Sequence, residues 1–175
     1  MISVRDAFFE GVERTNFFLG KQGHDFTIYP KCANIIEICQ ELTNQDKSAK
    51  QREMKYPGVF LLRDYAENYT ATWQNQITTT IQILIVTDSK SYYTADERQE
   101  KVYKPVLIPA CEAILKAFER YIVSDFNSGF QKIERDMISN ALYEATTQNK
   151  TQNLFNDMLD GIELRNLKLL IKKQC

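Results

Sequence analysis

Residues 73–87, WQNQITTTIQILIVT, carry the strongest strand pattern of the chain. Successive side chains of a strand point to opposite faces of a sheet. The odd-numbered face is apolar or β-branched throughout: Ile77, Thr79, Ile81, Ile83 and Ile85. The even-numbered face begins polar and becomes apolar: Thr78, Thr80, Gln82, Leu84 and Val86. The pattern therefore predicts a long strand that is solvent-exposed on one face in its first half and buried on both faces in its second half.

Two shorter strands are predicted ahead of the long one. The turn Tyr56-Pro57-Gly58 opens an apolar run over residues 59–65, which we expect to pair antiparallel with the long strand. Residues 26–30, FTIYP, alternate in polarity, and they predict a short strand that ends at its proline.

Two amphipathic helices are also predicted. One is N-terminal and begins at Ser3, whose side chain is suited to cap a helix. The other begins at the capping box of residues 94–97, is interrupted by Pro105 and Pro109, and has its clearest apolar stripe around residues 106–123. A stripe of this kind is typical of a core face rather than of a cofactor site.

Three apolar segments leave helix and strand open as alternatives: residues 32–42, 130–143 and 162–171. In the last segment the apolar residues change face, with Ile162 and Leu164 on one side of a strand and Leu167, Leu169 and Ile171 on the other. A strand there needs a bulge near Arg165-Asn166. A helix through the same residues is the rival interpretation.

Two polar stretches, near residues 43–55 and 144–160, show no apolar period, and we interpret them as long loop insertions. We expect a single domain over residues 1–175. The predicted fold class is α+β, with a mainly antiparallel sheet packed against two main helices, the N-terminal one and the one around residues 106–123.

Composition limits the classes of function. The chain has 175 residues, and its 22 Lys and Arg against 23 Asp and Glu leave a net charge of −1. A domain that binds nucleic acid tightly usually carries an excess of basic residues, so this charge balance argues against such a function.

No apolar run approaches the roughly 20 residues of a membrane helix. Four cysteines and one histidine show no metal-ligand spacing, so we expect no metal and no cofactor. Because no secretion signal is recognisable, we expect free thiols and assembly in a cytoplasm.

No motif for catalysis is present in the sequence. The one histidine, His24, follows a glycine in a predicted turn and has no nucleophile beside it. Asp64, Glu67 and Asp88 lie at predicted strand ends, where turn residues are also common. We therefore predict that the protein is not an enzyme. A small hydrolase that uses scattered carboxylates stays as a distant alternative.

The order of elements carries more information than any one motif. A helix, a short strand and a polar loop precede a strand opened by Tyr56-Pro57, a long strand opened by Trp73, and a capped helix with Tyr103-Lys104-Pro105. This order resembles the tail terminator, or tail completion, proteins of tailed bacteriophages, the lambda-type minor tail protein family. The resemblance covers nearly the whole chain and rests on the order and spacing of the elements.

The resemblance implies a structural virion protein. Members of this family form a ring, commonly sixfold, that joins the tail to the head, and related connector rings follow the twelvefold symmetry of the portal. It implies a homo-oligomeric ring in contact with portal, connector or tail ring proteins, assembled in the host cytoplasm, with DNA passing through the lumen without specific binding. No membrane partner is implied.

Eight residues are candidates for contacts with neighbouring subunits or rings: Phe9, Phe17, Lys47, Lys50, Arg52, Lys55, Tyr92 and Tyr93. The two phenylalanines fall off the apolar stripe of the first helix, and the basic residues follow the long polar loop. The competing interpretation is a non-viral α+β binding or adaptor module without catalysis. In that case changes in residues 43–55 would affect ligand binding and leave assembly intact.

Overall fold

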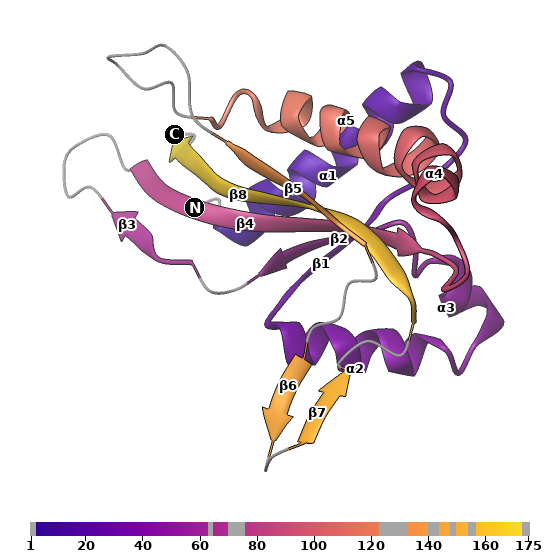
Figure 1. Cartoon of the computed structure of the whole chain (residues 1–175). Coiled ribbons are helices and arrows are strands. Elements are labelled where there is room, and N and C mark those ends of the chain that lie inside the picture. Colours follow the sequence, from indigo (N-terminus) through magenta and orange to yellow (C-terminus); the bar gives the residue numbers. More distant parts are fainter. Residues whose placement is uncertain are drawn as a thin grey trace.

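The computed structural model describes residues 3–62, 65–69, 76–122, 133–139, 144–147, 150–153 and 157–172. Six strands form one mixed sheet in the order β1-β2-β4-β8-β5, with β3 paired to β4 (Figure 1). These strands are β1 (Tyr29–Ala33), β2 (Gly58–Leu62), β3 (Glu67–Tyr69), β4 (Gln76–Asp88), β5 (Glu134–Ile138) and β8 (Leu159–Lys172). The strands β6 (Glu144–Thr147) and β7 (Lys150–Asn153) form a separate hairpin.

The sheet is antiparallel except for the parallel pair β1 and β2. The α+β class and the mainly antiparallel sheet are thus confirmed. The first strand was placed wrongly, because β1 begins at Tyr29 and contains Pro30. Tyr29 N–H donates to Pro57 O at 3.0 Å, so the next residue, Pro30, faces the open edge. A proline is tolerated there because no ladder hydrogen bond is needed from it.

The long strand β4 has the predicted burial. Its odd-numbered residues from Ile77 to Thr87 are all buried. Its even-numbered residues are exposed or half-buried up to Gln82, and Leu84 and Val86 are fully buried. Both faces are therefore covered only in the second half of the strand.

The predicted bulge lies in β8. Ile81 pairs with Leu167 and Ile83 pairs with Leu164, so β8 carries one extra residue at Arg165-Asn166. Asn166 has a φ of 60°, a left-handed conformation that asparagine tolerates better than most residues. The extra residue brings five apolar side chains of β8 to the same face of the sheet: Ile162, Leu164, Leu167, Leu169 and Ile171. The strand interpretation of this segment is confirmed.

One face of the sheet is covered by α1 (Val4–Lys21) and α5 (Ile108–Phe118), which lie together above it in Figure 1. The predicted caps of α1 and of α4 (Ala95–Arg98) are present at Ser3 and Thr94. A Cβ on Gly11 would lie 2.4 Å from the Phe118 ring, so glycine allows the close approach of α1 and α5.

The predicted interruption at Pro105 and Pro109 is wrong. The helical backbone continues from α4 through the π-helix η1 (Gln99–Leu107) into α5. A wider π-helical turn is one way for a helix to absorb a residue that cannot donate a backbone hydrogen bond. Pro109 is the second residue of α5, at the point where the backbone passes from π-helical to α-helical geometry.

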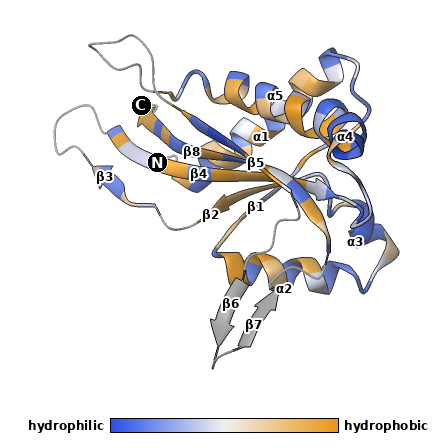
Figure 2. Cartoon of the chain, in the orientation of Figure 1, coloured by the Kyte–Doolittle hydropathy of each residue, from blue (hydrophilic) through white to orange (hydrophobic). Residues whose placement is uncertain are grey.

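The opposite face of the sheet is covered by α2 (Ile35–Gln45), which lies below it in Figure 1. The Asn34 side chain accepts from Glu37 N–H at 2.9 Å and caps this helix, which decides the ambiguous segment 32–42 in favour of a helix beyond Ala33. The apolar side chains of α2 meet those of three strands: Ile38, Cys39 and Leu42 against Phe60, Leu62, Leu84, Val86 and Leu159. Figure 2 shows this apolar face of α2 turned toward the sheet.

Both predicted loops contain secondary structure. Residues 43–55 include the end of α2 and a short helix, α3 (Ala49–Glu53). Residues 144–160 include the β6–β7 hairpin and the start of β8. The segment 130–143 contains the edge strand β5, while residues 130–132 and 140–143 lie outside the described residues.

The sheet therefore has two unlike ends. At the closed end, residues 83–88 of β4 and 159–164 of β8 lie between helices on both faces. At the open end, residues 76–82 of β4 and 165–172 of β8 have α1 and α5 on one face, and no described helix packs on the other. No helix among the described ranges combines the length and apolarity required to cross a bilayer.

Candidate interface pocket at the closed end

The candidate contact residues on α1 differ in exposure. The ring of Phe9 is half-buried, lies edge-on to Phe8 at 5.6 Å, and packs against the core. Phe17 is 58% exposed, and the Lys21 ammonium lies 4.5 Å from its ring centroid. Of the two, only Phe17 is largely exposed at the surface.

The basic candidates around α3 fall into two groups. Lys47, Lys50 and Arg52 are exposed. The prediction that Lys55 lies in an exposed loop was wrong, because its side chain is buried. Its ammonium lies 2.8 Å from Asp46 Oδ1 and 2.5 Å from Asp157 Oδ2. Its role is to join the chain before β2 to the chain before β8.

Burial and charge act in opposite directions on Lys55. Burial alone would lower the pKa of Lys55, but the hydrogen bonds to Asp157 and Asp46 carry the pKa above its ordinary value. The Tyr56 hydroxyl donates to the same Asp157 carboxylate at 2.8 Å, and burial together with that carboxylate raises the pKa of Tyr56. Both groups keep their protons at neutral pH, and both bind Asp157, so they hold the segment before β2 against the segment before β8.

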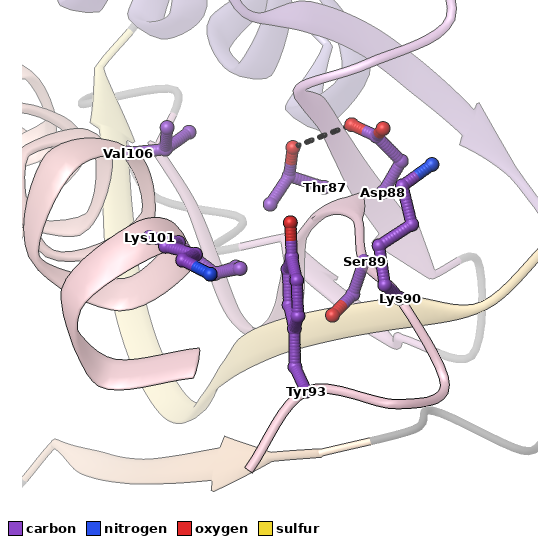
Figure 3. Close-up of a pocket in the computed structure, with 8 residues that line it drawn as sticks. Thr87, Asp88, Ser89, Lys90, Tyr93, Lys101 and Val106 are labelled. Atoms are coloured by element: carbon purple, nitrogen blue, oxygen red, sulfur yellow. Dashed lines mark hydrogen bonds between the residues drawn. The ribbon is translucent and has the colours of Figure 1, made fainter. Parts of the chain in front are cut away.

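Tyr92 and Tyr93 lie beside a pocket of about 210 Å³ at the closed end (Figure 3). The end of β4, the turn that follows it and the helix η1 form its wall: Thr87, Asp88, Ser89, Lys90, Tyr93, Lys101, Val102 and Val106. In Figure 3 the Tyr93 hydroxyl points into the space between Lys101 on one side and Thr87 and Asp88 on the other.

A buried ion pair supports the pocket from behind. Arg98 Nη1 donates to the two Asp160 oxygens at 2.5 and 2.7 Å and to Ser89 Oγ at 3.0 Å, and Ser89 Oγ donates to Asp160 at 2.5 Å. Arg98 Nη2 donates to Lys90 O at 3.1 Å. Asp160 is fully buried and Arg98 nearly so. These bonds fix the turn 87–90 against the first residues of β8.

The sequence interpretation missed this pair. Arg98 follows an ordinary capping box, and Asp160 was assigned to a polar loop. The available signal was the position of Asp160 between Leu159 and Ile162, because an acidic residue within an apolar strand pattern needs a buried partner.

The Lys101 ammonium at the mouth of the pocket is held by two neighbours. It donates to Glu97 Oε1 at 2.8 Å and lies 4.7 Å from the Tyr93 ring centroid. The bond with Glu97 raises the pKa of Lys101, and the bonds from Lys101 and the Thr94 backbone lower the pKa of Glu97. Both groups are charged over the physiological range, so the pocket mouth carries a fixed ammonium group.

A second cavity of about 380 Å³ lies between the edge strand β1 and the helices α2 and α3. Its wall includes the buried Lys31, whose ammonium lies 2.6 Å from Glu41 Oε1. The Gln45 Oε1 atom, also in this wall, is buried without a hydrogen-bond partner in the described structure.

The other residues weighed as catalytic candidates do not gather. The His24 ring packs against Phe26 at 5.5 Å, and Asp64 lies outside the described residues. Within the described part of the chain, no group of three His, Cys, Asp or Glu side chains has a metal-binding arrangement. Burial raises the pKa of the Cys39 thiol to about 11 and also raises that of Cys111, which suits thiols that pack in a core.

No protein-family model matches the sequence, and no curated protein matches it at a significant level.

Proposed function

We propose that this protein is a structural subunit of a ring in the head–tail connector or tail of a tailed bacteriophage, with a tail terminator or completion role. The ring would join the portal and head to the tail around the DNA channel, in six or twelve copies. The proposal is supported by the order and spacing of elements that resemble the tail terminator family.

The observation that carries the proposal is the unlike construction of the two ends of the sheet. A closed ring needs two different surface patches on each subunit, one for each neighbour. The closed end offers a framed pocket with the 73% exposed ring of Tyr92 at its side. The open end offers a sheet face on which Thr80 and Lys168 are exposed. These are two distinct patches at opposite ends of β4.

The charge balance suits a DNA conduit. A net charge of −1 gives the ring no strong overall attraction for nucleic acid. DNA that must pass through the lumen is then not retained by it. Near-neutral subunits also approach one another without strong mutual repulsion.

Light scattering on a sizing column and negative-stain microscopy test the proposal on the full chain. At a concentration of tens of micromolar, and again after addition of the portal protein of the same phage, we expect annular particles of six or twelve copies. A folded monomer under both conditions would contradict the ring and favour the binding-module alternative.

A further inference from the structure

The pocket beside Tyr93 is lined by residues from the end of β4, the turn after it and η1. Two of these residues are lysines, Lys90 and Lys101, and one is acidic, Asp88. Val102 and Val106 form the apolar part of the wall. A volume of about 210 Å³ suits one side chain rather than a large ligand.

Lys101 keeps donor capacity for a further partner. An ammonium group has three N–H donors, and the described contacts of Lys101 are one hydrogen bond to Glu97 and the face of the Tyr93 ring. The Tyr93 hydroxyl points into the same space. A carboxylate that enters the pocket can therefore accept from an ammonium and from a phenol.

The walls of the pocket are held in place before any partner arrives. Ser89 N–H donates to Met158 O at 2.9 Å, and Arg98 binds Asp160, Ser89 Oγ and the Lys90 carbonyl. Binding groups held on a rigid frame lose little entropy when a ligand is bound.

Tyr92 supplies an apolar contact next to the pocket. Its ring is 73% exposed and lies edge-on to the Tyr93 ring at 5.2 Å. Exposed tyrosines beside a pocket are typical of the centre of protein interfaces, where one ring gives a large contact area at low entropic cost.

We propose that this pocket binds a glutamate or aspartate side chain of a neighbouring polypeptide, which packs its own apolar surface on Tyr92. The Asp88 carboxylate in the wall disfavours a phosphate, which carries more negative charge than a carboxylate. The apolar wall of Val102 and Val106 suits the methylene groups of an acidic side chain. The assembly role of this pocket rests on the proposed ring, whereas its preference for a carboxylate does not.

The carboxylate preference is tested without any ring. The 15N-labelled protein is titrated with N-acetyl-glutamate methylamide at constant ionic strength, and the amide signals of residues 87–102 are followed by NMR. We expect saturable shifts there with a millimolar Kd, and much smaller shifts with the matched glutamine compound. Equal shifts for both compounds, or none at these residues, would overturn the proposal.

Lys104 provides a matched control for Lys101. Both lie on η1, both pair with a glutamate four residues earlier, and their side chains are 55% and 51% exposed, respectively. Only Lys101 lines the pocket. Lys101→Gln should weaken binding of the glutamate compound by roughly fivefold, and Lys104→Gln should leave it within about twofold. An equal effect of the two changes would contradict the proposed site.

Ring formation gives the second readout. Lys101→Glu and Tyr92→Ala should each remove annular particles while the monomer stays folded by circular dichroism, and Lys104→Glu should assemble as the wild type does. Rings that persist in Lys101→Glu would refute the contact. If the wild type forms no rings, the proposed function fails. The NMR titration with N-acetyl-glutamate methylamide still decides whether the pocket binds a carboxylate.

Discussion

The closed and open ends of the sheet use the same two long strands in different ways. At the closed end, Leu84 and Val86 of β4 are buried against α2, and the ion pair of Arg98 and Asp160 is buried as well. At the open end, the same face carries the exposed Thr80. The ion pair of Glu10 and Arg120 lies beside that end, with side chains 43% and 40% exposed.

The difference shows how a single strand builds two environments. Among the described residues, a second layer of helix is present only where the even-numbered residues of β4 become apolar. Along the rest of β4, no described helix packs on that face of the sheet. We therefore expect stability to depend mainly on the closed end, and four predictions test this in order of decreasing effect.

Asp160→Ala should cause the largest loss. It leaves the buried Arg98 guanidinium without its carboxylate, and breaking a buried pair in this way costs about 3–5 kcal/mol. The control is Asp136→Ala on the edge strand β5, where Asp136 lies 3.0 Å from Arg165 and both side chains are about half exposed. That change should cost about 1 kcal/mol or less. Urea unfolding measures both, and equal losses would show that the buried pair at the closed end is worth no more than an exposed pair at the sheet edge.

Leu84→Ala should rank next. Leu84 is fully buried between the sheet and α2, so truncation leaves a cavity and costs about 2–5 kcal/mol. Leu170→Ala changes the same residue type on the same face at the open end, where Leu170 is only half-buried. Its loss should be about 1 kcal/mol. If thermal unfolding ranks the two variants in the reverse order, α2 does not stabilise the closed end as described.

Gly161→Ala tests the close contact of β4 and β8. A Cβ there would lie 2.7 Å from the Ile85 carbonyl oxygen, so the backbone must shift, at a cost of about 1–3 kcal/mol. Gly20→Ala is the matched change, because nothing lies within 4 Å of a Cβ at that position. The midpoint of thermal unfolding should fall for the first variant and stay equal or rise for the second. A neutral Gly161→Ala would mean that the two strands have room to separate.

The smallest effect is expected for Glu10→Gln. Hydrogen bonds from Arg120 and Tyr121 lower the pKa of Glu10, so the carboxylate stabilises the folded state at pH values above its unfolded pKa. That contribution, about 1 kcal/mol or less for an exposed pair, is lost as the pH falls through the folded pKa. The wild type should exceed Glu10→Gln in stability at pH 7, and the difference should shrink steadily as the pH is lowered through the folded pKa of Glu10. A difference that persists at low pH would assign the effect to packing instead of charge.

The candidate site was predictable only in part. Tyr93 was identified from the sequence, but its neighbours Lys101 and Ser89 were not, because pocket walls come from segments that meet only after folding. Lys55 was assigned to an exposed loop, since nothing in its polar surroundings indicates that Asp157, about a hundred residues later, neutralises it.

The sequence by itself determined the local features. Alternation along residues 73–87 determined which half of β4 is covered on both faces, and the change of apolar phase at Arg165-Asn166 determined the bulge. Capping residues determined the starts of α1 and α4, because a cap acts on amides within its own first turn. Only the tertiary structure decided which partners the buried charges have. It also decided that the helical backbone continues past Pro105 and that β1 lies parallel to β2, since contacts distant in sequence outweigh local preference.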